Sequence, residues 1–219
     1  MYARFFTKAL ADLGIAPKEL REPFARLFTQ GMIRMGGSKM SKSKGNLVAP
    51  AKYLDTVGAD ALRLFHLFVG PPADDVDWTA QTDEVIDGCG RFLSRVWRLA
   101  TGEVAAIEGS KPPAGDLERD THRLVAKVSE DYDRWSYNTA VAACMEFTNL
   151  LYKHAQAGGA IDAGVDALLL LMAPMAPHIT AELWERRHPG EHVHAHAWPA
   201  CAPALATALT ETMVVQVNG

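Results

Sequence analysis

Lys39, Lys42 and Lys44 alternate with Ser41 and Ser43 in one short polar run, which is composed like a ligand-binding site. The run reads Gly36-Gly37-Ser38-Lys39-Met40-Ser41-Lys42-Ser43-Lys44-Gly45-Asn46. Lysine ammonium groups are compact charges that suit phosphate oxygens, and serine hydroxyls or backbone N–H groups add hydrogen bonds. Flanking glycines let the backbone approach a ligand closely. The run therefore predicts a loop that closes over a polyphosphate and stabilises charge developing during displacement at phosphorus.

Composition alone leaves a second interpretation open, because basic runs are frequent on protein surfaces. The same residues also fit a solvated basic loop or a nuclear-localisation-like tract. The run is not a Walker A loop, since the pattern G-x-x-x-x-G-K-[ST] does not occur in the chain.

Arg91, Arg95 and Arg98 form a second candidate site, because steps of four and three residues place them on one helix face. As an RNA contact they would bind the phosphate backbone in a salt-dependent, sequence-independent way. The alternative is a solvated face on which they pair with acidic residues of the same helix, namely Asp83, Glu84 and Asp87.

No metal site is expected. Four histidines lie between residues 188 and 196, but no matching set of cysteines or carboxylates surrounds them at a familiar zinc spacing. The odd number of cysteines, far apart and without a CxxC pair, argues against a disulfide framework and fits a reducing compartment. These cysteines are Cys89, Cys144 and Cys201.

Helical periodicity predicts that most of the chain is α-helical. The expected helices cover residues 1–13, 50–54, 60–69, 82–100, 116–135, 137–156, 162–173 and 174–187. Residues 24–35 fit a short helix followed by a strand at about 31–35, and residues 213–217 read as a second strand. Thr82 is the expected N-cap of its helix. The polar run at 39–46 has the composition of a flexible loop, and residues 188–203 are expected to be irregular.

Composition and charge bound the class of protein. The 219 residues are 48% hydrophobic and 22% charged, which excludes a disordered or collagen-like chain. The longest apolar run, residues 167–173, is far shorter than the ~20 residues of a membrane span. Residues 1–69 hold 11 basic and 5 acidic side chains, whereas the rest hold 11 and 21. This basic first third suggests that it binds an anion such as phosphate or nucleic acid, and the alternative is a chance fluctuation in surface charge.

The order of the residues in the lysine run resembles a sequence motif of a known family. Residues 39–43 match the KMSKS signature of class I aminoacyl-tRNA synthetases, and Lys44-Gly45-Asn46 continues it as that family does. The flanking segments resemble the leucyl-tRNA synthetases. They include Tyr2-Ala3-Arg4-Phe5-Phe6, Gly58-Ala59-Asp60-Ala61-Leu62-Arg63, Pro71-Pro72, Asp77-Trp78 and Ala173-Pro174-Met175-Ala176-Pro177-His178.

This resemblance implies a mainly α fold. A remnant of an α/β class I catalytic domain, with connector helices and the KMSKS loop, would occupy residues 1–75. A helical anticodon-binding bundle would occupy 76–210, and residues 211–219 would begin a truncated C-terminal domain.

The resemblance also implies a function, namely ATP-dependent attachment of leucine to tRNA(Leu) through leucyl-adenylate. Lys42 and Lys39 would be catalytic, with ATP bound by residues 39–43, that is by Lys39, Met40, Ser41, Lys42 and Ser43. Mg²⁺ would accompany ATP, and Arg91, Arg95 and Arg98 would contact tRNA. A cytoplasmic, monomeric protein without a membrane partner is expected.

The family's His-x-Gly-His motif does not occur in this sequence. The chain therefore resembles a C-terminal fragment of such an enzyme, and we expect it to be inactive alone. The alternative function is a stand-alone tRNA-binding or structural helical module in which the lysine loop is vestigial.

Overall fold

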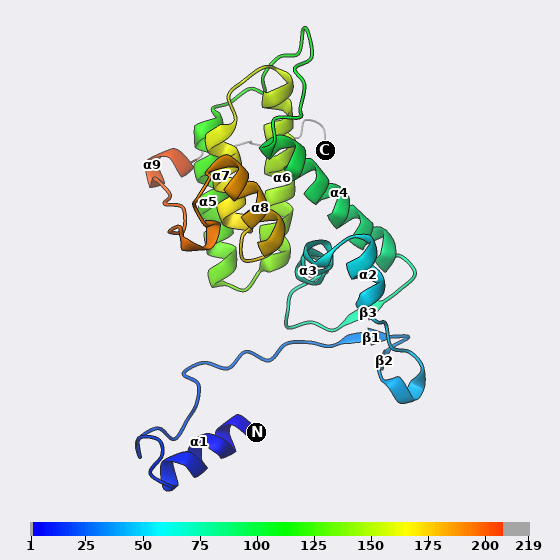
Figure 1. Cartoon of the computed structure of the whole chain (residues 1–219), viewed down its shortest axis with the longest axis vertical. Helices are drawn as coiled ribbons and strands as arrows, with labels where there is room; N and C mark the ends of the chain where they lie inside the picture. Colours follow the sequence, from blue (N-terminus) through cyan, green and yellow to red (C-terminus); the bar gives the residue numbers. More distant parts are fainter. Residues whose placement is uncertain (1, 208–219) are drawn as a thin grey trace, which may run out of the picture. The chain divides into compact units, whose positions relative to one another are not determined.

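A computed structural model of the chain describes residues 2–207. Contacts divide the chain into two compact units, Met1–Gly31 and Met32–Gly219. Helices dominate the second unit in Figure 1, and this confirms the predicted mainly α fold.

The first unit consists of helix α1 (Tyr2–Asp12) and an irregular segment that continues to residue 31. The Nε of Arg4 donates to both carboxylate oxygens of Glu22 at 2.9 Å, and this bond lowers the pKa of Glu22. The predicted short helix after residue 24 is wrong, since no helix forms there. A short amphipathic helix needs to bury its apolar face. Leu27, on the expected apolar face, is 80% exposed.

The second unit begins with a small sheet of strand order β2-β1-β3. Strand β1 (Ile33–Met35) pairs antiparallel with β2 (Ser38–Lys39) and parallel with β3 (Val76–Trp78). Helices α2 (Ala51–Thr56) and α3 (Ala59–Phe68) lie between β2 and β3 in the sequence. A parallel pair bridged by helices fits the expected remnant of an α/β domain. The predicted strand at 31–35 is confirmed, whereas β2 and β3 were not predicted.

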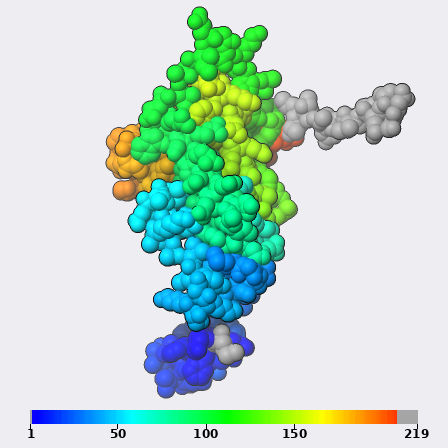
Figure 2. Space-filling model, turned by 90° about the vertical axis from the view of Figure 1, so that its right-hand side faces the viewer, coloured from blue at the N-terminus to red at the C-terminus, as the bar shows by residue number. Residues whose placement is uncertain are grey.

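The connector helices α2 and α3 join this sheet to the rest of the unit. Leu64 and Phe65 of α3 are fully buried, and the Phe65 ring meets Trp78 of β3 edge-on at 5.5 Å between centroids. On the other side, α3 packs against α4 (Thr82–Ala100) and α6 (Tyr137–Gln156). Figure 2 shows the surfaces of these segments as continuous.

Within residues 2–207, five helices form a bundle around one apolar core. They are α4 and α6, together with α5 (Leu117–Asp133), α7 (Asp162–Met172) and α8 (Pro177–Arg187). Long apolar side chains from each of these helices are completely buried, including Ile86, Val128, Leu151, Leu168 and Leu183. The helical periodicity of the sequence thus predicted this bundle correctly.

Helix α8 starts at Pro177 rather than at the predicted residue 174. Proline fits the first turn of a helix, where its missing N–H is not needed. It also disfavours helical geometry in the residue before it, and Ala176 has φ −130° and ψ 69°. Residues 173–176 therefore form a tight corner between α7 and α8.

Several smaller elements complete the described chain. Gln81, not Thr82, is the N-cap of α4, and the Thr82 hydroxyl accepts instead from the Thr79 N–H at 3.0 Å. Residues 188–203 are largely irregular, as predicted, apart from the 3₁₀ turn η2 (Val193–Ala195), and the short helix α9 (Pro203–Ala206) follows. The predicted strand at 213–217 and domain at 211–219 lie outside the described residues, and the boundary between 75 and 76 stays a prediction. Of residues 2–207, none belongs to a helix with the length and apolar character needed to cross a membrane.

Candidate functional site

A tight hairpin presents the start of the lysine run. Gly36 and Gly37, with φ of 59° and 69°, form the two-residue turn between β1 and β2. Two positive φ values in succession are the geometry that matches strand twist, and glycine adopts it without steric cost. Residues 38 and 39 are thereby turned back along β1.

Two aspartates fasten this hairpin to the neighbouring strand. The Gly37 N–H donates to Oδ1 of Asp77 on β3 at 3.2 Å, and the Met32 N–H donates to Oδ1 of Asp75 at 2.8 Å. The guanidinium of Arg34 lies between both carboxylates, 3.4 Å from each. Since Asp75 and Asp77 are about 40 residues away in sequence, this anchoring depends on the tertiary fold.

Beyond the hairpin, the lysine run folds into an ordered turn. The Ser41 N–H donates to the side-chain oxygen of Asn46 at 2.9 Å, and the Asn46 amide donates back to the Lys39 carbonyl at 3.4 Å. The Ser41 hydroxyl accepts from the Lys44 N–H and so caps the 3₁₀ turn η1 (Lys42–Lys44). Gly45, with φ of 67°, ends the turn. The structure thus replaces the flexible loop predicted from composition by a clamped one.

The three ammonium groups of this turn are presented to solvent. Lys39, Lys42 and Lys44 are all exposed, and none forms an ion pair within residues 2–207. Lys39 also stands directly across from Arg34 in the β1–β2 register. Like charges facing each other across strands are destabilising. An arrangement that concentrates unpaired positive charge in this way is suited to binding an anion with several negative oxygens.

The predicted phosphate-binding residues therefore occur together but differ in their surroundings. Lys42 and Ser43 are exposed on η1, and Met40 is half-buried. The Ser41 hydroxyl already serves as a helix cap, so its local role is structural. Sequence reasoning assigned no role to Asn46 or Asp77, although both carry the hydrogen bonds that shape the site. The signal for Asn46 was its position directly after Gly45, since asparagine favours such turn hydrogen bonds.

The arginines of α4 are not equivalent. The Nη1 of Arg95 donates to the side-chain oxygen of Asn149 at 2.6 Å, and its guanidinium lies 4.5 Å from the centre of the Tyr152 ring. Arg98 lies 5.9 Å from the same ring. Arg91 is exposed and forms no ion pair in the described part of the chain. Arg95 is therefore held between α4 and α6, whereas the charges of Arg91 and Arg98 remain available.

The predicted alternative pairing with Asp83 does not occur. Asp83 accepts from the Lys52 ammonium at 2.8 Å and from the Tyr53 hydroxyl, and these bonds hold its pKa below the usual value. They connect α2 to the start of α4. An open groove of about 540 Å³ lies beside Arg91 and Arg95, with Met145 and Asn149 of α6 on its other wall.

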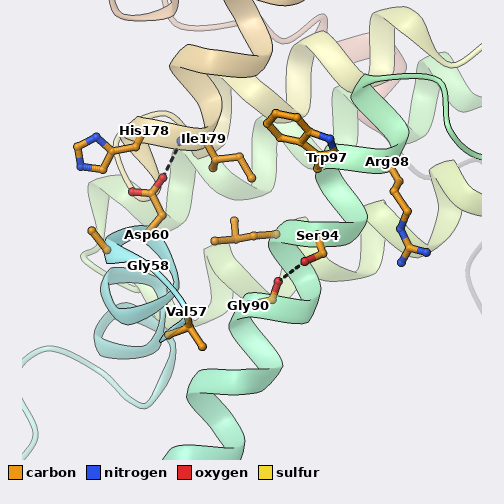
Figure 3. Close-up of a pocket in the computed structure, with 11 residues that line it drawn as sticks. Val57, Gly58, Asp60, Gly90, Ser94, Trp97, Arg98, His178 and Ile179 are labelled. Atoms are coloured by element: carbon orange, nitrogen blue, oxygen red, sulfur yellow. Dashed lines mark hydrogen bonds between the residues drawn. The ribbon is translucent and has the colours of Figure 1, made fainter. Parts of the chain in front are cut away.

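A larger cavity of about 700 Å³ lies where α3, α4 and α8 meet (Figure 3). Its walls include the apolar side chains of Val57, Leu93 and Trp97. Asp60 and His178 lie together at one edge, and the Asp60 carboxylate accepts from the Ile179 N–H at 2.7 Å. Sequence reasoning assigned no site to this junction.

No metal centre emerges from the described residues, because among positions 2–207 no three histidine, cysteine or carboxylate side chains form a suitable group. Two of the clustered histidines instead lie against Trp184 with tilted rings, with ring centroids 4.4 Å away for His188 and 4.7 Å for His196.

Two family models match the chain. One, described as tRNA synthetases class I (I, L, M and V), matches residues 2–79. The other, described as the anticodon-binding domain of tRNA ligase, matches residues 116–219.

Curated relatives and a solved structure agree with these matches. Proteins named leucine–tRNA ligase from Lawsonia intracellularis and Syntrophobacter fumaroxidans are 40% and 41% identical over the whole chain. The chain spans only 28% of the length of each. The crystal structure of the ternary complex of Agrobacterium radiobacter K84 agnB2 LeuRS, tRNA and LeuAMS superposes with a TM-score of 0.74 at 33% identity. That match covers 94% of this chain and 27% of the other.

Proposed function

Because the chain belongs to the class I tRNA synthetases, we propose that it is the part of an ATP-dependent leucine–tRNA ligase that carries the phosphate-binding lysine turn and a tRNA-binding helical bundle. Its similarity to leucine–tRNA ligases along its entire length supports the leucine-specific branch. The alternative of a stand-alone module with a vestigial loop is not favoured, because the matches include both the lysine turn and the bundle.

The observation that carries this proposal is the geometry of the lysine turn. Its backbone is fixed by Asn46 and Asp77, while the ammonium groups of Lys39, Lys42 and Lys44 remain unpaired among the described residues. A fixed turn with free cations is preorganised for anionic oxygens, so little reorganisation is needed when a charged ligand arrives.

In the proposed reaction, the carboxylate of leucine attacks the α-phosphorus of ATP and pyrophosphate leaves. The leucyl group then passes from the adenylate to the terminal ribose of the tRNA. Displacement at phosphorus depends mainly on positioning and charge stabilisation. Lys42 would contact the phosphates as negative charge shifts to the leaving pyrophosphate. Lys39 would assist or order the turn, and Met40, Ser41 and Ser43 would complete the ATP contacts.

Magnesium would be carried by ATP rather than held by this hairpin. Mg²⁺ prefers carboxylate, phosphate and water oxygens. The two carboxylates attached to the hairpin, those of Asp75 and Asp77, are already bound to Arg34 and to backbone N–H groups. The hairpin itself therefore offers cations to phosphate and no free ligands to a metal ion.

The helical bundle would hold the tRNA. Residues 116–219 match the anticodon-binding model, which supports this role for the bundle. The bundle is acidic on balance, since 21 acidic and 11 basic residues follow position 69. Contact would therefore be confined to a local basic stripe, with Arg91 and Arg98 as its free charges. We propose the division at residues 75 and 76 as the boundary between the catalytic remnant and this bundle.

Substitution of Lys42 in the full-length enzyme tests the function. Losing one preorganised contact to developing charge costs on the order of 3 kcal/mol of activation free energy. We therefore expect Lys42→Ala to lower the rate of leucine-dependent ATP–pyrophosphate exchange about 100-fold. The matched control is Lys111→Ala, a surface lysine in the linker after α4, which should leave exchange unchanged.

An unchanged exchange rate in Lys42→Ala would remove Lys42 from this role. Absence of leucine-dependent exchange in the unaltered full-length enzyme would overturn the proposed function itself. The 219-residue chain alone should show no exchange above background, because it has no His-x-Gly-His motif.

A further inference from the structure

The corner between α7 and α8 leaves backbone groups that its own residues do not satisfy. Helix α8 has no side-chain cap at its N-terminus, because its N-cap residue is Ala176. The first N–H groups of a helix and the last C=O groups before a turn have no partners within the helix. Met175 and Ala176 are almost completely buried, so water does not readily replace those partners.

Two side chains from α3 supply the missing partners. The Asp60 carboxylate accepts from the N–H of Ile179, the third residue of α8, at 2.7 Å. One turn further along α3, Arg63 donates from Nη2 to the Pro174 carbonyl at 3.0 Å and from Nε to the Met175 carbonyl at 3.2 Å. These bonds join residues that are more than 110 positions apart in sequence.

The charges of this pair match the corner they bind. A carboxylate is favourable at the N-terminal end of a helix, and a guanidinium is favourable beside carbonyl groups at a C-terminal end. Asp60 and Arg63 are three residues apart and so lie on one face of α3. All three bonds are charge-assisted and therefore stronger than neutral hydrogen bonds. We call this arrangement, comprising Asp60, Arg63 and residues 174–179, the corner clamp.

Packing between α3 and α8 is incomplete beside the clamp, because the cavity of about 700 Å³ lies between these helices and α4. Both helices also pack against α4. Figure 3 shows the Asp60 carboxylate reaching across the edge of this cavity to the start of α8. Asp60 is only 6% exposed, and the second oxygen of its carboxylate is buried without a hydrogen-bond partner among the described residues. An incompletely satisfied buried carboxylate is costly, which argues that the bond to α8 serves more than local packing.

The clamp lies on a short covalent path from the lysine turn. Asn46, which closes that turn, is followed after residues 47–50 by α2 and then by α3. The bonds from Lys52 and Tyr53 of α2 to Asp83 fix the same path to α4. Any change in the angle between α3 and the corner would therefore change the placement of the bundle relative to the lysine turn.

We propose that Asp60 and Arg63 are positioning residues for the transfer of the aminoacyl group to tRNA. By binding the α7–α8 corner, they fix the bundle that holds the tRNA relative to the turn that holds ATP phosphates. The inference rests on the proposed function, because it requires both ligands. It assigns these residues no contact with substrate, so the step that needs only ATP and leucine should not depend on them.

The full-length enzyme carrying Asp60→Asn, Arg63→Met or both tests this inference. Asp60→Asn keeps the size and one acceptor oxygen but removes the charge, and Arg63→Met keeps much of the apolar stem. We expect each change to lower kcat/KM for tRNA charging about tenfold and to leave leucine-dependent ATP–pyrophosphate exchange within twofold. Because both residues bind the same corner, the double variant should lose less than the product of the two single effects.

Controls separate positioning from general damage. Asp55→Asn on α2 and Arg134→Met on the bundle alter exposed side chains outside the clamp, so both activities should stay unchanged. Arg63→Lys keeps the charge and one donor group, and it should recover part of the charging activity. Thermal unfolding of each variant shows whether it remains folded.

Two results would overturn the inference, namely unchanged tRNA charging in the double variant, or equal loss of charging and exchange in folded variants. If the unaltered enzyme shows no leucine-dependent exchange, the proposed function fails first and this inference fails with it. Exchange that persists while charging falls supports both.

Discussion

Around the lysine turn, an arrangement of charges that destabilises the local fold is suited to binding an anion. Lys39 faces Arg34 across the β1–β2 pair, and this like-charge pairing is unfavourable unless it is compensated. The carboxylates of Asp75 and Asp77 neutralise Arg34 from the neighbouring strand. They leave Lys39, Lys42 and Lys44 unpaired among the described residues. The positive charge that remains is therefore concentrated on the residues proposed to bind ATP.

Asn46 gives a prediction at the residue scale. Its side chain connects the Ser41 N–H to the Lys39 carbonyl and so keeps the turn closed. Asn46→Ala should make the lysines less ordered and lower the rate of ATP–pyrophosphate exchange about tenfold in the full-length enzyme, equivalent to about 1.4 kcal/mol. Thr56→Ala is the control, because the Thr56 hydroxyl bonds only to carbonyls of its own helix. Equal exchange rates for the Asn46 variant and the unaltered enzyme would contradict the clamping role.

At the scale of elements, α4 serves two surfaces at once. One face carries Leu93 and Trp97 beside the cavity at α3 and α8, and another carries Arg91 and Arg95 beside the groove at α6. The apolar face fixes the helix in the bundle, which gives the arginines defined positions. Arg95 is further fixed by Asn149 and Tyr152. The helix therefore acts as the frame on which a local basic stripe is displayed.

The difference among the arginines gives a prediction for this element. Arg91→Ala and Arg98→Ala should each weaken tRNA binding and reduce the slope of log K against log salt by about one, as loss of one phosphate contact does. Arg95→Ala should instead lower the free energy of unfolding by about 1–3 kcal/mol, since its charge-assisted bond to α6 is lost. Binding titrations at several salt concentrations and urea unfolding measure the two effects.

Arg134→Ala is the matched control for these variants, because Arg134 pairs with Glu130 on the surface of α5. Its variant should keep the salt slope of the unaltered protein. If Arg91→Ala and Arg98→Ala also keep that slope, tRNA does not contact this stripe.

At the scale of the whole molecule, the core keeps two thiols neutral. Burial raises the pKa of Cys89 to about 11 and that of Cys144 to about 12, from an ordinary value of 9.0. Neither takes part in a disulfide, and both lie in the bundle core. This burial agrees with the prediction, made from cysteine number and spacing, that no disulfide framework exists.

The buried thiols predict how stability depends on pH. A thiol whose pKa is raised on folding stabilises the folded state fully below pH 9, and this contribution is lost as the pH rises toward 11 or 12. Between pH 9 and 10, each thiol should lower the free energy of unfolding by about 1 kcal/mol. A variant with Cys89→Ala and Cys144→Ala should therefore show a shallower decline with pH than the unaltered protein in urea unfolding experiments. Identical declines in the two proteins would contradict this account.

The sequence by itself determined the helices of the bundle, the lysine run and the family. These features depend on local periodicity, on short-range composition and on residue order, all of which can be read without a fold. The sequence predicted a short helix after residue 24 that does not form. It also predicted a flexible loop where hydrogen bonds in fact hold the lysine turn. In both cases contacts between distant segments decide the outcome. The Leu27 side chain finds no partner to bury it and stays exposed, whereas Gly37 is bound by Asp77 of a distant strand.

Only the tertiary structure decided how the lysine turn, the connector helices and the bundle are joined. Strands β2 and β3 are two and three residues long, too short for any periodic pattern to show. The partners Asp60 and Ile179 are 119 positions apart. Such pairings are chosen by packing of distant segments and by the need to satisfy buried polar groups, and neither requirement is visible in local sequence.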